Sequence, residues 1–179
     1  MRGSYTAEGA GLSLPYSPQM RCYFLRHGIA ADPESWSGSD ADRPLTREGC
    51  ERMEFEAKAI DKLGLEVECI VTSPLLRAKQ TAEFVVQRLA DAKIVEDRRL
   101  ADGFNLERLG DILSSHSDVE SIMLVGHEPS MSATIGRAVG NASVELKKAA
   151  LAGIEFGDRG AGTLFCLIPP KVLVALGKR

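Results

Sequence analysis

The sequence predicts a three-layer α/β/α domain, in which helices cover both faces of a mostly parallel β-sheet. Two observations favour this class. Short apolar runs typical of buried strands alternate along the chain with stretches of helical periodicity. Three of the strand-like runs stop abruptly at basic or imidazole side chains, as expected where parallel strands meet a ligand at their carboxyl ends. The length of 179 residues suits a single domain of this kind.

The chain divides into three predicted segments. Residues 1–19 are rich in Gly, Ser and Pro and follow neither the helical nor the strand period, so we expect a leader that is flexible or foreign to the native protein. Residues 20–170 carry the alternating pattern and form the predicted domain. Residues 171–179 are expected to be a short apolar C-terminal tail.

Composition narrows the classes of partner. The chain has 22 basic and 25 acidic residues and a formal net charge of −3, which argues against binding nucleic acid or a membrane surface through bulk charge. No apolar segment approaches the roughly 20 residues that span a bilayer, and the N-terminus lacks the layout of a secretory signal. The four cysteines form no C-x-x-C pair, so we expect reduced thiols. We therefore expect a monomeric protein located in the cytoplasm.

The first half of the domain contains two predicted strands, each followed by a helix. The helices are bounded by Thr46, a suitable N-cap, and by Pro74, which favours a helix start. A polar loop over residues 30–44 separates the first strand from the first helix, and Trp36 is expected to anchor this loop rather than to stack on a substrate. The strands cover residues 22–25 and 68–71, and the helices cover residues 46–63 and about 75–90.

The second half adds four predicted strands and two helices. The strands cover residues 93–96, 121–125, 151–156 and 163–168, and the helices cover residues 106–114 and a stretch that begins near residue 130. A Gly- and Asp-containing turn over residues 157–160 joins the last two strands as a hairpin. A loop over residues 100–103 precedes the first of these helices and contains Asp102.

Three of the predicted strands end in residues that can bind or attack an anion. These are Arg26 and His27 after the first strand, Ser73 and Arg77 after the second, and His127 after the strand over residues 121–125. Taken alone, Arg26 could be a solvated strand end and His27 an ordinary loop residue, but repetition at three strand ends favours a shared site. In a parallel sheet these ends lie at one edge, so the basic side chains should converge on a crevice that fits a phosphate.

Local features support a phosphate ligand in this crevice. Guanidinium groups bind phosphate oxygens through planar forks. Arg77 lies in the first turn of its predicted helix, where a cation costs about 0.3–1 kcal/mol unless an anion shares the site. Gly28 lets the backbone approach a bound group closely. The helix that starts after Pro129 is expected to add backbone N–H donors.

The chemistry predicted for this crevice is covalent catalysis by a histidine. The sequence contains no G-x-x-x-x-G-K-[ST] loop, no H-E-x-x-H and no compact Cys/His cluster, so we expect neither a metal nor another cofactor. A neutral imidazole held through its other nitrogen is a competent nucleophile, and we assign that role to His27. Arg26, Arg77 and His127 would stabilise the charge on the transferring phosphoryl group. His116 is expected to be an exposed loop residue.

Four motifs, in this order, resemble those of the histidine phosphatase superfamily. They are Leu25-Arg26-His27-Gly28, Arg43-Pro44-Leu45-Thr46-x-x-Gly49, Ser73-Pro74-x-x-Arg77-Ala78-x-Gln80-Thr81-Ala82 and Val125-Gly126-His127. The resemblance covers about residues 20–170, and the absence of a long helical insertion is similar to the SixA branch of phosphohistidine phosphatases. It implies a phosphoglycerate mutase-like fold and a phosphohistidine intermediate on His27. It also implies a phosphate pocket of Arg26, Arg77 and His127; we expect Gly28 and Ser73 beside this pocket and Arg43 at its rim.

Asp102 departs from the SixA pattern and leaves the substrate class open. The run Leu100-Ala101-Asp102 is similar to the one that supplies a proton donor in mutase-like and general phosphatase members, whereas Asp-Gly is also a common turn dipeptide. Our preferred hypothesis is a phosphatase that acts on phosphohistidine in a partner protein during signal transduction. The alternatives are a phosphatase of small phosphomonoesters, with Asp102 as catalytic acid, and a non-catalytic phosphate-binding module.

Overall fold

A six-stranded mixed sheet forms the centre of the structure. The computed structural model describes residues 19–89, 91–157 and 162–179, so almost all of the predicted leader and the turn after Gly157 lie outside the described residues. The strands are β1 Gln19–Arg26, β2 Cys69–Thr72, β3 Lys93–Glu96, β4 Ser121–Gly126, β5 Leu151–Gly157 and β6 Thr163–Ile168. Each of them matches a predicted strand to within a few residues.

The sheet has the order β3-β2-β4-β1-β5-β6 and is parallel over its first four strands. β5 runs antiparallel to β1, and β6 runs antiparallel to β5, so the last two strands form the predicted antiparallel pair. In register, Arg26 lies opposite Gly126, and Thr72 lies opposite Val125. The carboxyl ends of β1, β2 and β4 therefore meet at one edge of the sheet, and the predicted mostly parallel sheet is confirmed.

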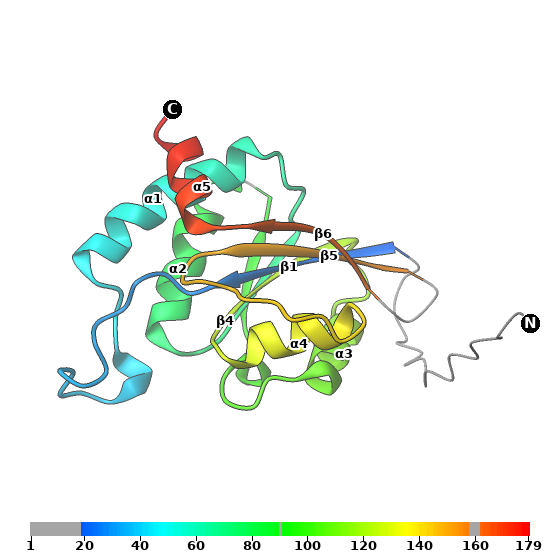
Figure 1. Cartoon of the computed structure of the whole chain (residues 1–179), viewed down its shortest axis with the longest axis horizontal. Coiled ribbons are helices and arrows are strands. Elements are labelled where there is room, and N and C mark those ends of the chain that lie inside the picture. The colour runs from blue at the N-terminus through cyan, green and yellow to red at the C-terminus, as the bar shows by residue number, and fades with distance from the viewer. Residues whose placement is uncertain (1–18, 90, 158–161) are drawn as a thin grey trace, which may run out of the picture.

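Helices cover both faces of the sheet, as the three-layer prediction requires. Figure 1 shows α1 and α5 on one side of the strands and α3 and α4 on the other. Apolar residues of α2 belong to the same buried cluster as those of α1 and α5, whereas α3 and α4 share a second cluster. The helices are α1 Arg47–Lys62, α2 Leu76–Val86, α3 Leu106–Ser115, α4 Ser130–Ala138 and α5 Pro170–Gly177, with short 3-10 turns η1 Asp40–Asp42 and η2 Arg98–Leu100.

The start of α1 ties the first helix to the loop that follows β1. The Thr46 side chain accepts a hydrogen bond from the backbone N–H of Gly49 at 2.9 Å, as expected of an N-cap. Gly49 itself packs so closely on the loop that a Cβ there would collide with the carbonyl oxygen of Ile29. The backbone N–H of Thr46 also donates to Ile29 O at 2.9 Å. The segment just after His27 is thereby fixed against α1.

The C-terminal segment differs from the tail that we expected. Most of residues 171–179 lie in α5, which begins with Pro170 in its first turn and packs along α1 (Figure 1). Leu173 is fully buried between the helices, and Gly177 approaches the backbone of Phe55 so closely that no Cβ would fit. The sequence did not predict this helix because the apolar run after Pro170 is too short and too uniform to show a clear helical period.

The structure also bears on the expected cysteine chemistry. All four cysteines are free thiols; Cys22 and Cys69 are buried, and Cys50 and Cys166 are half-buried. Burial raises the pKa of the Cys22, Cys69 and Cys166 thiols, so they stay protonated at neutral pH. Over residues 19–89, 91–157 and 162–179, none of the helices has the length and apolar character needed to cross a membrane.

Candidate active site

Three neighbouring strands deliver the predicted residues to one place. His27 follows β1, Ser73 follows β2, and His127 follows β4, which lies between them in the sheet. The backbone N–H of His27 donates to Gly126 O at 3.1 Å, and that of Ser73 donates to Val125 O at 3.0 Å. The ring centroids of His27 and His127 are 5.2 Å apart. The sheet register thus brings the two histidines together.

His27 is held in a single neutral form. Its side chain is buried, with 6% of the residue exposed, and its Nδ1 lies 2.8 Å from the carbonyl oxygen of Gly28. Because a carbonyl only accepts, Nδ1 carries the proton and Nε2 keeps its lone pair. Burial, together with the nearby charges of Arg77 and Arg26, lowers the pKa of His27 from 6.5 to about 3, although the hydrogen bond to Gly28 acts in the opposite direction. The ring is therefore an uncharged base with Nε2 available.

His127 is oriented by Ser73. Its Nε2 lies 2.8 Å from the Ser73 hydroxyl oxygen, and Ser73 is itself fully buried. Burial, and next the charge of Arg77, lowers the pKa of His127 to about 4. When the hydroxyl of Ser73 donates to Nε2, the proton of the neutral ring resides on Nδ1, which is buried and makes no hydrogen bond to the described residues. That N–H is then free for an acceptor.

Arg77 reaches the site from the first turn of α2 and is paired there with Asp40. Its Nη1 donates to the carbonyl oxygen of Asp40 at 2.9 Å, and its Nη2 donates to the carboxylate at 3.0 Å. Arg43 donates from Nε to the other carboxylate oxygen at 2.8 Å. The hydrogen bond from Arg43, and the charge of Arg77, hold the pKa of Asp40 below its ordinary value. Asp40 is therefore a carboxylate that links the predicted rim residue Arg43 to Arg77.

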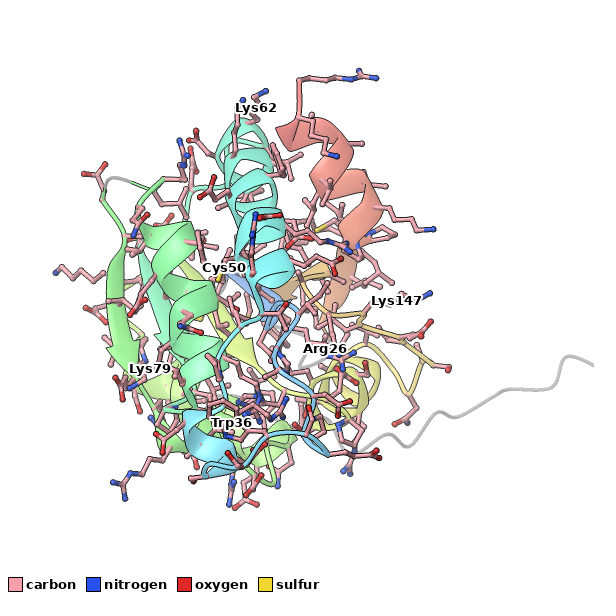
Figure 2. The ribbon with its side chains drawn as sticks, turned by 90° about the vertical axis from the view of Figure 1, so that its left-hand side faces the viewer. Arg26, Trp36, Cys50, Lys62, Lys79 and Lys147 are labelled. Atoms are coloured by element: carbon pink, nitrogen blue, oxygen red, sulfur yellow. The ribbon has the colours of Figure 1, made fainter. Side chains whose placement is uncertain are left out.

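Asp40 is a site residue that the sequence reasoning missed. It lies in η1, within the polar loop over residues 30–44, where an aspartate is unremarkable by composition. A signal was present in Arg77, because a cation in the first turn of a helix favours a nearby anion. Trp36 donates from Nε1 to Ser39 O at 2.9 Å, so it acts within the loop as the expected anchor. Figure 2 shows Trp36 below Arg26 on the face that carries the loop.

Arg26 completes the group of cationic residues at the strand ends. Its Nη1 donates to the carbonyl oxygen of Leu146 at 3.0 Å, while its Nε is buried without a partner. Within the described part of the chain, the buried side-chain nitrogens that lack a hydrogen-bond partner are Arg26 Nε, Arg77 Nε and His127 Nδ1. Buried donors are seldom left unpaired in folded proteins. Three unpaired donors on three converging residues point to an acceptor that binds here.

Two residues of the α2 motif link these elements. The backbone N–H of Gly28 donates to Thr81 Oγ1 at 3.0 Å, and Thr81 Oγ1 donates in turn to Arg77 O at 2.7 Å. Gln80 accepts at its Oε1 from the backbone N–H of Leu45 at 2.7 Å. The sequence reasoning quoted both residues in the α2 motif but gave them no role. In the structure they connect α2 to the segment around His27 and to the start of α1.

The backbone donors expected at the N-terminus of α4 are partly occupied within the chain. This end of the helix was expected to offer N–H groups to a ligand, but those of Met131 and Ser132 have partners in the protein. The backbone N–H of Ser132 donates to the carboxylate of Glu128 at 3.1 Å, and that of Met131 donates to His127 O at 3.1 Å. Glu128 thus occupies this end of α4, as a carboxylate at a helix N-terminus should. Glu128 directly follows His127 in the sequence, but the sequence reasoning gave it no helix-capping role.

Asp102 and His116 lie apart from this group. Asp102 is exposed in the loop after η2, and its carboxylate makes no hydrogen bond to the described residues, although its backbone oxygen accepts one from Arg108. Burial lowers the pKa of Arg77, and the negative charge of Asp102 acts in the opposite direction. The Asp102 carboxylate therefore lies within electrostatic reach of the site. His116 is not the exposed loop residue we expected: it is half-buried at the C-terminus of α3, with Nδ1 2.9 Å from Ile112 O.

Comparison with known proteins decides the family. The sequence model of the histidine phosphatase superfamily (branch 1) matches residues 22–105, which include Arg26, His27, Arg77 and Asp102. The chain is 26% identical to the phosphohistidine phosphatase SixA of Escherichia coli (strain K12), over 80% of this chain and 90% of that protein. This chain belongs to the histidine phosphatase superfamily. Within it the chain is a SixA-like member, and this membership supports phosphatase activity.

Other comparisons agree with this membership. A solved structure of the protein histidine phosphatase SixA complexed with tungstate has a TM-score of 0.73 and 26% identity, and the match covers 85% of this chain and 98% of that one. An uncharacterised protein of Picosynechococcus sp. is 36% identical over 87% of this chain and 99% of its own length. A phosphoglycerate mutase from Bacillus anthracis str. Sterne has a TM-score of 0.73 at 15% identity, over 91% of this chain and 98% of that one, which confirms the predicted phosphoglycerate mutase-like fold.

The lowered histidine pKa values generate a first prediction. A buried histidine whose pKa lies at about 3 or 4 stays neutral as the pH falls through 6.5, where an exposed ring becomes protonated. We expect His27 and His127 to remain neutral from pH 7 to pH 5, with the proton of His27 on Nδ1. Long-range ¹H–¹⁵N NMR spectra of the histidine rings, assigned with single His→Gln variants, measure both properties. A midpoint near pH 6.5 for His27, or a proton on its Nε2, would contradict this description of the site.

Proposed function

We propose that the protein is a phosphohistidine phosphatase, which removes phosphate from a histidine of another protein through a phosphoryl group carried briefly by His27. The observation that carries the proposal is the set of unpaired buried donors, Arg26 Nε, Arg77 Nε and His127 Nδ1, around a histidine with a free Nε2. Phosphate oxygens are acceptors that suit these donors. Tungstate, which the similar SixA structure contains, is a tetrahedral oxyanion like phosphate.

In the first step, Nε2 of His27 attacks the phosphorus atom of the substrate. A bond forms between Nε2 and phosphorus, and the bond between phosphorus and the substrate imidazole breaks. The electron pair passes to the departing ring, which leaves as neutral imidazole because its other nitrogen already carries a proton. The hydrogen bond between Nδ1 and Gly28 O keeps the attacking ring in the reactive tautomer and favours the positive charge that the ring gains. Arg26, Arg77 and His127 bind the equatorial oxygens as their charge develops.

In the second step, water attacks the phosphoryl group on His27. The bond between phosphorus and Nε2 breaks, the ring regains its lone pair, and inorganic phosphate leaves with the oxygen of the water. The same donors serve both steps because the phosphorus moves little between them. We assign to Ser73 the orientation of His127, and to Arg43 the rim of the pocket, where it holds Asp40 beside Arg77. Gly28 was expected to let a ligand approach, but the space that its Cβ would take is occupied by Met53, and its carbonyl oxygen orients the His27 ring.

Phosphohistidine suits this site because its leaving group needs little help from an acid. Imidazole accepts a proton near neutral pH, with a reference pKa of about 6.5, so it departs readily. The carboxylate bonded to Arg77 is that of Asp40, whose lowered pKa keeps it ionised and unable to donate a proton. Asp102 is exposed and unbonded. The similarity to SixA supports the same substrate class. Free thiols agree with a cytoplasmic role in signal transduction.

A second candidate is the hydrolysis of small phosphomonoesters. The observation that favours it is the electrostatic effect of Asp102 on Arg77, which indicates a carboxylate in the neighbourhood of the phosphate pocket. An alcohol is a poor leaving group without a proton, and a positioned acid contributes on the order of 10²–10⁴ in rate. A non-catalytic binding module, the third hypothesis, would not require Nε2 of His27 to be free.

Ranking substrates tests the proposed function. We expect a phosphohistidine peptide to have the highest kcat/KM, at least tenfold above sugar phosphates and other small phosphomonoesters measured in parallel. His27→Ala should reduce every one of these activities to background, whereas His116→Ala, a matched change outside the site, should keep them. A phosphomonoester at the top of the ranking would favour the second candidate. Equal activity in His27→Ala and the parent would refute the assignment of the nucleophile.

Asp102 separates the two leading candidates by chemistry. If its carboxyl group protonates leaving groups, Asp102→Asn should slow hydrolysis of an alkyl phosphate at least tenfold and change phosphohistidine hydrolysis little, because only the alkoxide needs the proton. The measurement is kcat/KM for both substrates in parent and variant, with Asp91→Asn as a matched surface control. Equal losses on both substrates would mean that Asp102 acts through the loop or through Arg77, and not as an acid.

A further inference from the structure

A basic groove opens beside Arg26, outside the group of residues that bind phosphate. Its volume is about 500 Å³. The charged residues that line it are Arg26, Arg52, Lys147, Lys148, Lys171 and Glu145. The described lining thus contains five cationic side chains and one carboxylate, although the chain as a whole has a net charge of −3. Positive charge is concentrated here, next to a residue of the proposed phosphate pocket.

The loop that carries two of these lysines is fixed to the catalytic segment. The backbone N–H of Ala149 donates to the carbonyl oxygens of Arg26 and His27, at 3.0 and 3.2 Å. To do so Ala149 adopts a φ of 59°, a conformation that costs a non-glycine residue of order 1 kcal/mol or more. The Arg26 side chain adds its hydrogen bond to Leu146 O. The backbone that carries Lys147 and Lys148 is therefore fixed near Arg26, and Figure 2 shows Arg26 and Lys147 on the same side of the molecule.

Several of these cations lack a strong intramolecular partner. In the described structure, Lys148 and Lys171 form no ion pair, and Lys147 lies 3.8 Å from the Glu145 carboxylate, with both side chains largely exposed. Exposed pairs of this kind contribute little. Lys171 also lies in the first turn of α5, which contains no acidic residue, although a cation there opposes the helix dipole. The side chains of these three lysines are therefore available to pair with an anion that binds in the groove.

We propose that this groove binds an acidic segment of the phosphorylated protein substrate, close to the phosphohistidine that enters the active site. The proposal deepens the proposed function and rests on it. The groove adjoins Arg26, so a peptide with its phosphohistidine at His27 would lay the neighbouring residues across Lys147, Lys148 and Lys171. Carboxylates suit these lysines in sign, and long-range attraction would speed encounter at low ionic strength. The single carboxylate of Glu145 repels an acidic segment less than the three lysines attract it.

The test uses two phosphohistidine peptides that differ only in flanking residues, one with three Glu and the other with three Gln. Three enzymes are compared: the parent, a groove variant with Lys147→Glu, Lys148→Glu and Lys171→Glu, and a control with Lys62→Glu, Lys93→Glu and Arg137→Glu. The control makes the same change in net charge at exposed sites that do not line the groove. Figure 2 shows Lys62 at the far end of α1 from Arg26. Binding of the unphosphorylated, fluorescently labelled peptides is measured alongside kcat/KM for the phosphorylated ones. Hydrolysis of a sugar bisphosphate by the same three enzymes is measured in parallel.

We expect the parent to prefer the acidic peptide at least tenfold in kcat/KM at low salt, and to bind its unphosphorylated form more tightly than the neutral one. The groove variant should reduce both preferences to less than twofold, and the control variant should keep them. A parent that does not discriminate in binding, or a groove variant that keeps the preference, would overturn the proposal.

Preferential binding that depends on the groove, without hydrolysis of either peptide, would support the groove and refute the phosphohistidine phosphatase function. A groove effect on a sugar bisphosphate, and none on the peptides, would assign the groove to small anions and overturn the proposal.

Discussion

The hydrogen bond between His27 Nδ1 and the carbonyl oxygen of Gly28 is the interaction on which the rest of the site depends. It fixes the proton on one ring nitrogen, and burial keeps the ring neutral, so that Nε2 presents a lone pair at neutral pH. The cationic donors around it are useful only if that atom can form a bond. The fold contributes by bringing β2, β4 and β1 side by side in parallel register, which sets Ser73 and His127 against His27.

The site holds cationic side chains in a largely buried environment, and the chain compensates for them locally. Asp40 bridges Arg77 and Arg43, and the carbonyl oxygen of Leu146 takes one donor of Arg26. Arg26 and Arg77 each still have a buried Nε that makes no hydrogen bond within the described structure. A phosphate would therefore bind to donors that are already in position. The side chains would need little reorganisation, which is the condition for strong electrostatic stabilisation of a transition state. The basic groove extends the same charge pattern beyond the pocket.

The sequence predicted the fold well because its elements are marked by strong local signals. Buried strands are short apolar runs, and Thr46 caps α1 as expected. His27 and His127 could be recognised because each ends a strand. Contacts between distant segments were not predictable in this way: Asp40 reaches Arg77 across 37 positions, and the groove joins loops from both ends of the domain. The donors at the start of α4 were expected to be free because capping by Glu128 depends on a side-chain geometry that the sequence does not specify.

Trapping the intermediate tests the central claim most directly. The enzyme would be mixed with a phosphohistidine peptide labelled in its phosphoryl group, quenched in alkali within milliseconds because phosphohistidine is labile in acid, and digested for mass spectrometry. We predict a phosphoryl group on the peptide that contains His27, which appears before inorganic phosphate and decays as phosphate is released. Turnover that proceeds with no phosphoryl-enzyme, or with the phosphoryl group on another residue, would contradict the account.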